Sequence, residues 1–274
     1  MKKLFVFVSA LLVIFSLAAC GKNNASESKE TTLVVGASQV PHSEILKKAK
    51  PLLKKKGIDL QVKVINDYVT PNKALASGDL DANFFQHVPY LKNQMAKNKD
   101  FDFVNAGGIH IEPIGVYSKR YKKLSELPDG ATIIMSNSVA DHGRMLSLLD
   151  HEKLITLKQG IDKTTAKVED IAKNPKNLKF KTDVEAAMLP KVYQNDEADA
   201  VLINTNYALQ AGLNPMKDAI ALEGKESPYV NIITVRKGDE NKKAIKTLVE
   251  VLHSKEIQDF ILEKYKGAVV PVSE

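Results

Sequence analysis

The chain has 274 residues, of which 44% are hydrophobic and 26% are charged, the balance of a globular protein large enough for two small domains. Its formal net charge is +6, but the lysines are dispersed, as they are between Lys47 and Lys56. This spread favours a solvated helix face over a nucleic-acid surface, so no nucleic-acid partner is expected. The only cysteine, Cys20, excludes an internal disulfide, and the fold must be stabilised by its core.

The first twenty residues, MKKLFVFVSALLVIFSLAAC, have the pattern of a secretory signal. Two lysines precede an apolar run from Leu4 to Leu17 that is too short for a comfortable membrane span. The last four residues resemble the lipobox of bacterial lipoproteins, in which the chain is cut before an acylated cysteine. We predict a signal peptide over residues 1–19 and an acylated Cys20, with palmitate among its chains, that anchors the protein to the extracytoplasmic face of the cell membrane. An uncleaved anchor helix is the alternative.

Residues 20–31 are small, polar and charged, which predicts a flexible tether after the lipidated cysteine. Beyond them, short apolar runs alternate with helical patterns. The first four predicted elements are a strand, a helix, a strand and a helix, over residues 33–37, 43–56, 60–65 and 71–77. The last helix is expected to begin near Pro71 and to stop at Gly78. This order favours an α/β fold with mostly parallel sheets.

Two segments far apart in the chain echo each other. Residues 74–85 read ALASGDLDANFF and residues 192–203 read VYQNDEADAVLI, each with a helix end, an acidic turn, an Asp-Ala pair and an apolar strand. Polar and aromatic side chains follow both strands. Because open α/β sheets bind ligands beyond the carboxyl ends of their strands, two such ends, one per lobe, are expected to face each other across a cleft. Chance similarity is the alternative.

Two further strand-rich stretches, residues 103–117 and 229–236, are interpreted as crossovers between lobes. The predicted domains are therefore lobe 1, formed by residues 32–116 plus 232–274, and lobe 2, formed by residues 117–231.

Four stretches of the chain resemble the MetQ/NlpA lipoproteins, the methionine-binding components of ABC importers. They are PHSEIL at 41–46, DANFFQHVPYL at 81–91, GGIHIEPIGVYS at 107–118 and SPYVNIITVRKGD at 227–239. The resemblance implies a two-lobed, periplasmic-binding-protein-like fold of type II with two chain crossovers. It also implies a monomer that captures L-methionine, or a closely related methionine compound, between the lobes and delivers it to a permease and its ATPase, without enzymatic activity or a cofactor.

One region departs from the family. The family often has a run like NDPTNGGRALLLL, whereas residues 137–149 here read NSVADHGRMLSLL. Asn137, Gly143 and Arg144 are kept, but the loop between them is rewritten. The choice between free methionine and a methionyl dipeptide is therefore left open.

The expected site must satisfy a carboxylate, an ammonium and a thioether. A guanidinium fork matches a carboxylate, and Arg144 is expected to supply it from the start of a predicted helix over residues 143–149. Its location after a strand and near a helix N-terminus also favours an anion. Asn204 and Asn231 are expected to accept from the ammonium or to donate to the carboxylate. The alternative for both asparagines is a turn-forming role.

Four aromatic side chains are expected around the thioether, whose sulfur favours ring edges. Phe85 and His87 lie two apart in an extended segment and so point the same way, whereas Phe84 faces the core. By resemblance, Tyr68 and Tyr90 complete this pocket. The alternative is that these rings belong to an ordinary core.

Other functions have weaker support in the sequence. No Gly-x-Ser-x-Gly, His-Glu-x-x-His or P-loop motif is present, which argues against an enzyme. The alternative function is that of a metal-ion-binding surface lipoprotein, since His87, His110 and His142 could converge on the cleft, although no histidine-rich spacing supports a site. A structural or adhesive surface protein is a third hypothesis.

Overall fold

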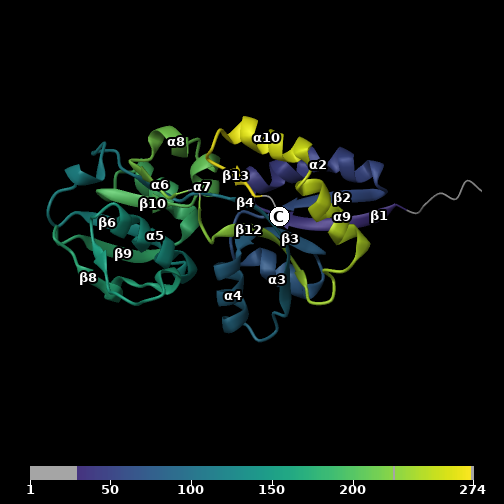
Figure 1. The fold of residues 1–274 in the computed structure, drawn as a ribbon, viewed down its shortest axis with the longest axis horizontal. Coiled ribbons are helices and arrows are strands. Elements are labelled where there is room, and N and C mark those ends of the chain that lie inside the picture. Colours follow the sequence, from purple (N-terminus) through teal and green to yellow (C-terminus); the bar gives the residue numbers. More distant parts are fainter. Residues whose placement is uncertain (1–29, 225, 273–274) are drawn as a thin grey trace, which may run out of the picture. The chain divides into compact units, whose positions relative to one another are not determined.

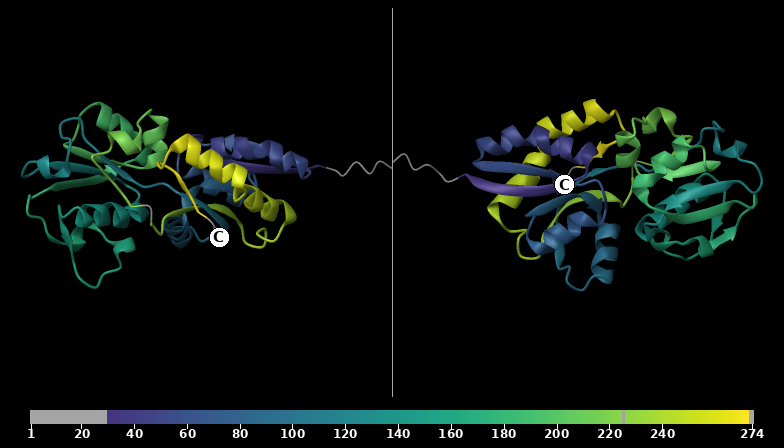
Figure 2. Two further views of the ribbon diagram at one scale, coloured as in Figure 1. Left: turned by 45° about the horizontal axis from the view of Figure 1, so that its top comes forward. Right: turned by 180° about the vertical axis from the view of Figure 1, so that it is seen from behind.

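The computed structural model describes residues 30–224 and 226–272, so the predicted signal peptide, Cys20 and nearly all of the predicted tether lie outside the described residues. The chain from Thr31 onward forms one compact unit. Figure 1 shows its two main sheets in separate halves, and Figure 2 shows the same separation from behind. Across the two described ranges, no helix is long and apolar enough to cross a membrane.

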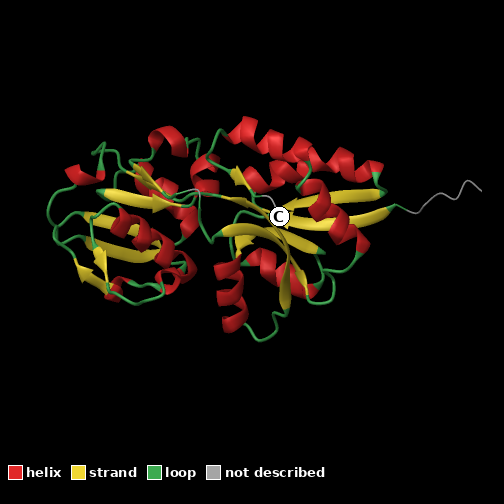
Figure 3. Cartoon of the chain, in the orientation of Figure 1, coloured by secondary structure: helices red, strands yellow, loops and turns green. Residues whose placement is uncertain are grey.

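The first sheet has six strands in the order β13-β4-β12-β3-β1-β2. Their bounds are β1 (Thr31–Ala37), β2 (Ile58–Val64), β3 (Ala82–His87), β4 (Phe103–Ile111), β12 (Val230–Arg236) and β13 (Val270–Pro271). Its helices are α2 (Glu44–Lys55), α3 (Thr70–Ser77), α4 (Val88–Lys97), α9 (Lys243–Leu252) and α10 (Lys255–Tyr265), preceded by the π-helical turn η1 (Gln39–Ser43). Figure 3 shows these helices packed around the strands.

Both faces of this sheet are buried under helices. Ile45 and Leu53 belong to the apolar stripe of α2, which packs with α9 and α10 on the face that carries Ile233 of β12. Ile232, the preceding residue of β12, packs on the opposite face with side chains of α3 and α4. Successive strand residues point to opposite faces, so the adjacent apolar residues Ile232 and Ile233 suit a sheet that is covered on both sides.

The second sheet has five strands in the order β11-β5-β10-β6-β9. Their bounds are β5 (Gly115–Tyr117), β6 (Thr132–Ser136), β9 (Lys179–Val184), β10 (Ala200–Ile203) and β11 (Ala221–Leu222). The helices of this half are α5 (Val139–His151), α6 (Leu189–Gln194), α7 (Thr205–Gln210) and α8 (Pro215–Asp218). Two strands, β7 (Thr156–Leu157) and β8 (Ile171–Lys173), form a separate ladder. The short 3-10 turns are η2 (Leu124–Glu126), η3 (Lys163–Thr165), η4 (Val168–Asp170) and η5 (Ala186–Met188).

The first four elements predicted from the sequence are confirmed as β1, α2, β2 and α3. Helix α3 has Pro71 in its first turn and ends at Gly78, whose φ of 86° lies in the left-handed region that favours glycine. The prediction of mostly parallel sheets is wrong. Among the described strands, four pairings are parallel and six are antiparallel. Strands β4, β5 and β12, at the crossings between the sheets, contribute five of the antiparallel pairings.

The chain leaves the first sheet after Ile111, joins the second at Gly115, and returns between Leu222 and Val230. Gly115 and Val116, which the sequence analysis places in lobe 1, pair in the second sheet. Val230 and Asn231, placed in lobe 2, pair in the first. The exact lobe boundaries remain a prediction.

The echo between the two halves has a structural counterpart. Asp81, before β3, donates its backbone N–H to the carbonyl of Val34 and accepts the Val34 N–H on its carboxylate, both at 2.8 Å. Asp199, before β10, makes the same pair of bonds with Thr132, at 3.1 and 2.8 Å. In both sheets the Asp-Ala pair thus joins a strand to its parallel neighbour. The repeated sequence pattern therefore reflects the same local strand pairing in both sheets, rather than chance similarity.

Candidate ligand-binding site

A small, partly open cavity with about 20 Å³ of free space lies where the chain passes between the two sheets. This space has room for about one water molecule. All seven predicted ligand-binding residues line it: Tyr68, Phe85, His87, Tyr90, Arg144, Asn204 and Asn231. The sequence analysis did not include five further lining residues: Gln86, Glu112, Asp141, Thr205 and Asn206.

One end of the cavity is aromatic. The rings of Tyr68, Phe85 and Tyr90 form a triangle with centroids 5.8 to 6.0 Å apart, and Ala140 packs against them. The hydroxyl of Tyr90 donates to the carbonyl of Tyr68 at 2.7 Å, which fixes the ring at the entrance of α4. These ring edges can surround an apolar or thioether side chain.

Phe84 and Phe85 are neighbours in β3 with different surroundings. Phe84 is fully buried in the core of the first sheet, where its ring contacts His42 and His110. Phe85 lies on the opposite face and lines the cavity. The prediction that Phe84 belongs to the core is confirmed.

Arg144 is buried, and one edge of its guanidinium already has partners. Nε and Nη2 both donate to Glu223, and Nη2 also donates to the carbonyl of Glu112 at 2.7 Å. Nη1 lies 4.0 Å from the carboxylate of Asp141, and the guanidinium lies 4.6 Å from the centre of the Tyr229 ring. Only the Nη1 edge is therefore left to meet a further anion.

The helix that carries Arg144 starts earlier than the sequence indicates. Helix α5 begins at Val139, not at residue 143, so Arg144 lies in its second turn. The prediction that Arg144 sits at the helix N-terminus is wrong, because Ala140 and Asp141 occupy the first turn. The backbone N–H groups that attract anions belong to that first turn.

Asp141 is the most enclosed charge of the site, with 1% of its surface exposed. Its two carboxylate oxygens face His87 Nε2 at 2.9 Å and Asn204 Nδ2 at 3.4 Å. Burial alone would raise the pKa of Asp141, but the hydrogen bond and charge of His87 and the charge of Arg144 outweigh it and lower the pKa to about 2. His87 is therefore part of the polar wall as well as a neighbour of Tyr90.

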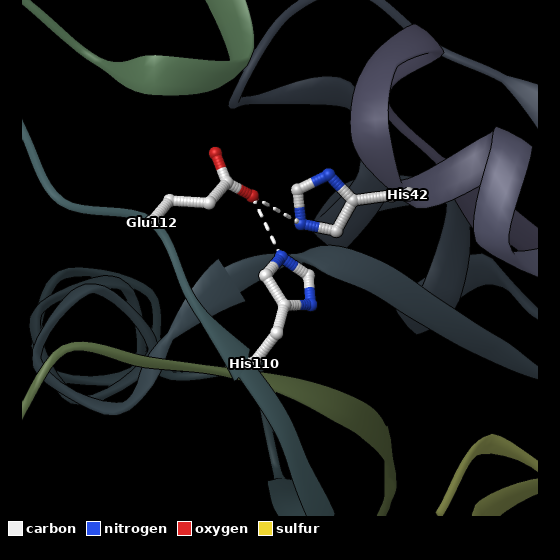
Figure 4. A group of neighbouring side chains, drawn as sticks. All are labelled: His42, His110 and Glu112. Carbon is white, nitrogen blue, oxygen red and sulfur yellow. Dashed lines mark hydrogen bonds and ion pairs between the residues drawn. The ribbon is translucent and has the colours of Figure 1, made fainter. Parts of the chain in front are cut away.

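Glu112 is held by two histidines, as Figure 4 shows. Its Oε1 lies 3.2 Å from His42 Nε2 and 2.8 Å from His110 Nε2, and all three residues are buried. Burial lowers the pKa of His42 to about 4 and that of His110 to about 3, so both rings are neutral at pH 7. His42 also faces the side-chain oxygen of Asn231, at 3.1 Å.

The three histidines named as a possible metal site do not share one centre. His110 faces Glu112, His87 faces Asp141, and His142 Nε2 donates to the carbonyl of Ser136 at 2.7 Å. The convergent group is instead His42, His110 and Glu112. The sequence offered a signal for it, because both histidines and Glu112 lie in two of the stretches that carry the family resemblance.

Direct hydrogen bonds join the two halves around the cavity. The Tyr68 hydroxyl donates to Asn206 Oδ1 at 2.7 Å, and the Tyr207 hydroxyl donates to the carbonyl of Asn66 at 3.2 Å. His87 and Asp141 make a further contact between the halves, at 2.9 Å. The cavity walls are thus connected by direct hydrogen bonds.

The NlpA lipoprotein family model matches residues 33–273. The chain belongs to the NlpA lipoprotein family. Over its full length it is 56% identical to a methionine-binding lipoprotein, MetQ, of Bacillus subtilis, and the match covers all of both chains. The family predicted from the sequence is therefore confirmed.

Solved structures of other proteins have a fold similar to that of this NlpA lipoprotein. A lipoprotein from Bacillus subtilis is 57% identical, with a TM-score of 0.87 over 89% of this chain and 99% of that one. A nutrient-binding protein from Burkholderia cenocepacia, bound to methionine, is 45% identical, with a TM-score of 0.83 over 88% and 100%. The predicted two-lobed type II fold is confirmed.

Proposed function

We propose that this NlpA lipoprotein captures L-methionine, or a closely related methionine compound, in the cavity between its lobes and delivers it to the permease and ATPase of an ABC importer. The observation that carries the proposal is the pairing of two chemistries in one cavity. Tyr68, Phe85 and Tyr90 offer ring edges to a thioether, and Arg144 with Asn204 and Asn231 offers polar groups to a zwitterion. The names of two relatives, which specify methionine as the bound compound, support the same function.

The two lobes explain how capture could signal to a membrane partner. A ligand that contacts both walls binds the closed arrangement more tightly than the open one and so favours closure. Capture requires no bond to be made or broken, and the proposed role is transport rather than catalysis.

Addition of L-methionine to ligand-free protein is expected to raise the melting temperature, because a ligand that binds only the folded state stabilises it by mass action. The radius of gyration measured by X-ray scattering should fall as the lobes close. Bound ligand must first be removed by partial unfolding and dialysis. An unchanged melting temperature at millimolar methionine would reject methionine as the ligand.

The lipid anchor is part of the same proposal. Acylation of Cys20 would hold a monomer on the extracytoplasmic face of the membrane, close to its permease. Cys20→Ala is expected to release the protein from membranes or to leave it unprocessed, because the chain has no second thiol to replace it. Fractionation and labelling with a fatty-acid analogue measure this, and normal labelling of the variant would contradict it.

One observation favours a second candidate function, metal binding. Nitrogens of His42 and His110 and an oxygen of Glu112 converge within 4.8 Å of one another, a ligand set that zinc accepts. Equilibrium dialysis against Zn²⁺ separates the two functions. If the three groups only bond to one another, we expect less than one tightly bound ion per chain, and no difference between the wild type and His110→Gln. One ion per chain, lost in His110→Gln, would establish the metal site.

A further inference from the structure

The solvent-facing side of helix α2 carries a concentration of positive charge. Six of the ten residues from Lys47 to Lys56 are lysines, and this run contains no acidic residue. The other side of the helix packs into the core of the first sheet, so the lysines lie along its outer side and at its C-terminal end. A helix C-terminus favours cations through its dipole, but that explains only the lysines of the last turn.

Part of this charge is neutralised within the protein. Lys48 pairs with Glu256 of α10 at 2.9 Å, and Lys56 pairs with Glu250 of α9 at 3.1 Å. The other four lysines of the run make no ion pair with any residue that the structure describes. We call these four exposed side chains the lysine face; they are Lys47, Lys50, Lys54 and Lys55.

The lysine face lies beside the point where the folded chain begins. The backbone N–H of Thr31 donates to the carbonyl of Gly57 at 2.9 Å, and the N–H of Gly57 donates to the carbonyl of Lys54 at 3.0 Å. Figure 1 shows the start of β1 and the end of α2 on the side of the first sheet farthest from the second sheet. The first residue of β1 is therefore bonded to the turn that directly follows the lysine face.

The length of the chain limits how far this end can lie from the predicted lipid anchor. Thr31 is eleven residues after Cys20. A chain of this length spans at most about 40 Å, even when it is fully extended. The residues between them include two lysines and two glutamates, so they add no net charge. An attraction between this end of the protein and an anionic membrane must therefore come from the folded chain, where the lysine face lies next to Thr31.

We propose that the lysine face binds an anionic phospholipid surface and holds the first half of the protein against the membrane that carries its anchor. Acyl chains limit the distance to the bilayer, whereas a patch of positive charge also selects the side that faces it. Each lysine close to an anionic surface is expected to strengthen binding about fivefold. The inference goes beyond methionine capture, and it rests on the proposed function only through the anchor at Cys20.

This orientation has a consequence for the ligand cavity. Helix α2 covers the face of the first sheet that carries Phe84 and Ile233, whereas Phe85 and α4 lie on the opposite face. With the lysine face on the bilayer, the aromatic end of the cavity is on the side of the sheet that points away from the membrane. The site can then take up its ligand from the surrounding solution while the protein stays at the membrane surface.

The test measures binding to vesicles, with the chain from Gly21 onward, which lacks the anchor but contains the whole compact unit. Vesicles of phosphatidylcholine alone are compared with mixed vesicles of phosphatidylcholine and phosphatidylglycerol. The wild type should sediment with the anionic vesicles and not with the neutral ones. High salt should release it, since the Debye length falls from about 10 Å at 0.1 M to about 3 Å at 1 M.

Replacement of Lys50, Lys54 and Lys55 together by glutamine should lower the partition coefficient on anionic vesicles by about 100-fold, as three steps of about fivefold. All three side chains are exposed, and the melting temperature shows whether the variant is folded. If it is not, Lys54→Gln alone takes its place, with an expected loss of about fivefold.

The matched control replaces three exposed lysines of the other half by glutamine, on β8 and β9, and so removes the same charge elsewhere. It should bind anionic vesicles like the wild type; its positions are Lys173, Lys179 and Lys181. The inference is overturned if the wild type binds both kinds of vesicle equally or neither, if the lysine-face variant binds like the wild type, or if both triple variants lose binding equally. These results leave methionine binding untouched, so they are distinguishable from a failure of the proposed function.

Discussion

Arg144→Ala is expected to lower the affinity for L-methionine by about two orders of magnitude or more, corresponding to about 3 kcal/mol. The guanidinium is buried against Glu223 and Asp141, and its free edge faces the cavity. Its removal would leave the ligand carboxylate unpaired and two protein carboxylates without their cation. Arg144→Lys should recover only part of the affinity, because an ammonium cannot reproduce the planar fork.

The other two arginines of the chain serve as controls for this experiment. Arg120 is exposed and bonds to Asp196 and Asp199, so Arg120→Ala should bind methionine like the wild type. Arg236 donates to the carbonyls of Leu75 and Leu80, so Arg236→Ala should lose stability rather than affinity. Calorimetry on the three folded alanine variants measures the affinity of each for methionine. Wild-type affinity in Arg144→Ala, with a loss in either control, would show that the ligand binds elsewhere.

Two neighbouring phenylalanines should respond in opposite ways to the same substitution. Phe84→Ala is expected to reduce the free energy of unfolding by about 3–5 kcal/mol, because it opens a cavity in a fully packed core. Phe85→Ala removes one of the three rings of the aromatic triangle and should weaken methionine binding by about tenfold or more. Its loss of stability should be smaller than that of Phe84→Ala.

Urea unfolding and calorimetry on both variants measure these effects. Each variant is the control for the other, since both remove the same ring from the same strand. A stability loss in Phe85→Ala as large as that in Phe84→Ala, with unchanged affinity, would assign Phe85 to the core and would contradict the aromatic side of the site.

Much of the site could be predicted because it depends on short motifs. The stretch DANFFQHVPYL places Phe85, His87 and Tyr90 by strand alternation and a following helix, and these relations are local. The echo of Asp81 and Asp199 was visible for the same reason. Each aspartate sits next to its own strand and bonds to the adjacent parallel one.

The sequence alone could not predict which distant residues bond to Arg144 and to Asn231. Glu223 meets Arg144 from 79 residues away, and His42 meets Asn231 from 189 residues away. Such contacts depend on how the two halves meet, and no local pattern encodes that. The early start of α5 was missed because Ser138, Val139 and Asp141 have weak helix preferences that tertiary packing overrides.

The hydrogen bonds between the halves also bear on the speed of exchange. Ligand can leave only when the walls separate, which requires the bonds from Tyr68 to Asn206 and from Tyr207 to Asn66 to break together. The closed form therefore sets a residence time that is longer than the contacts of the ligand alone would give, and entry waits for the fraction of open molecules. A membrane partner that pulls on either half would shorten this residence time without touching the ligand.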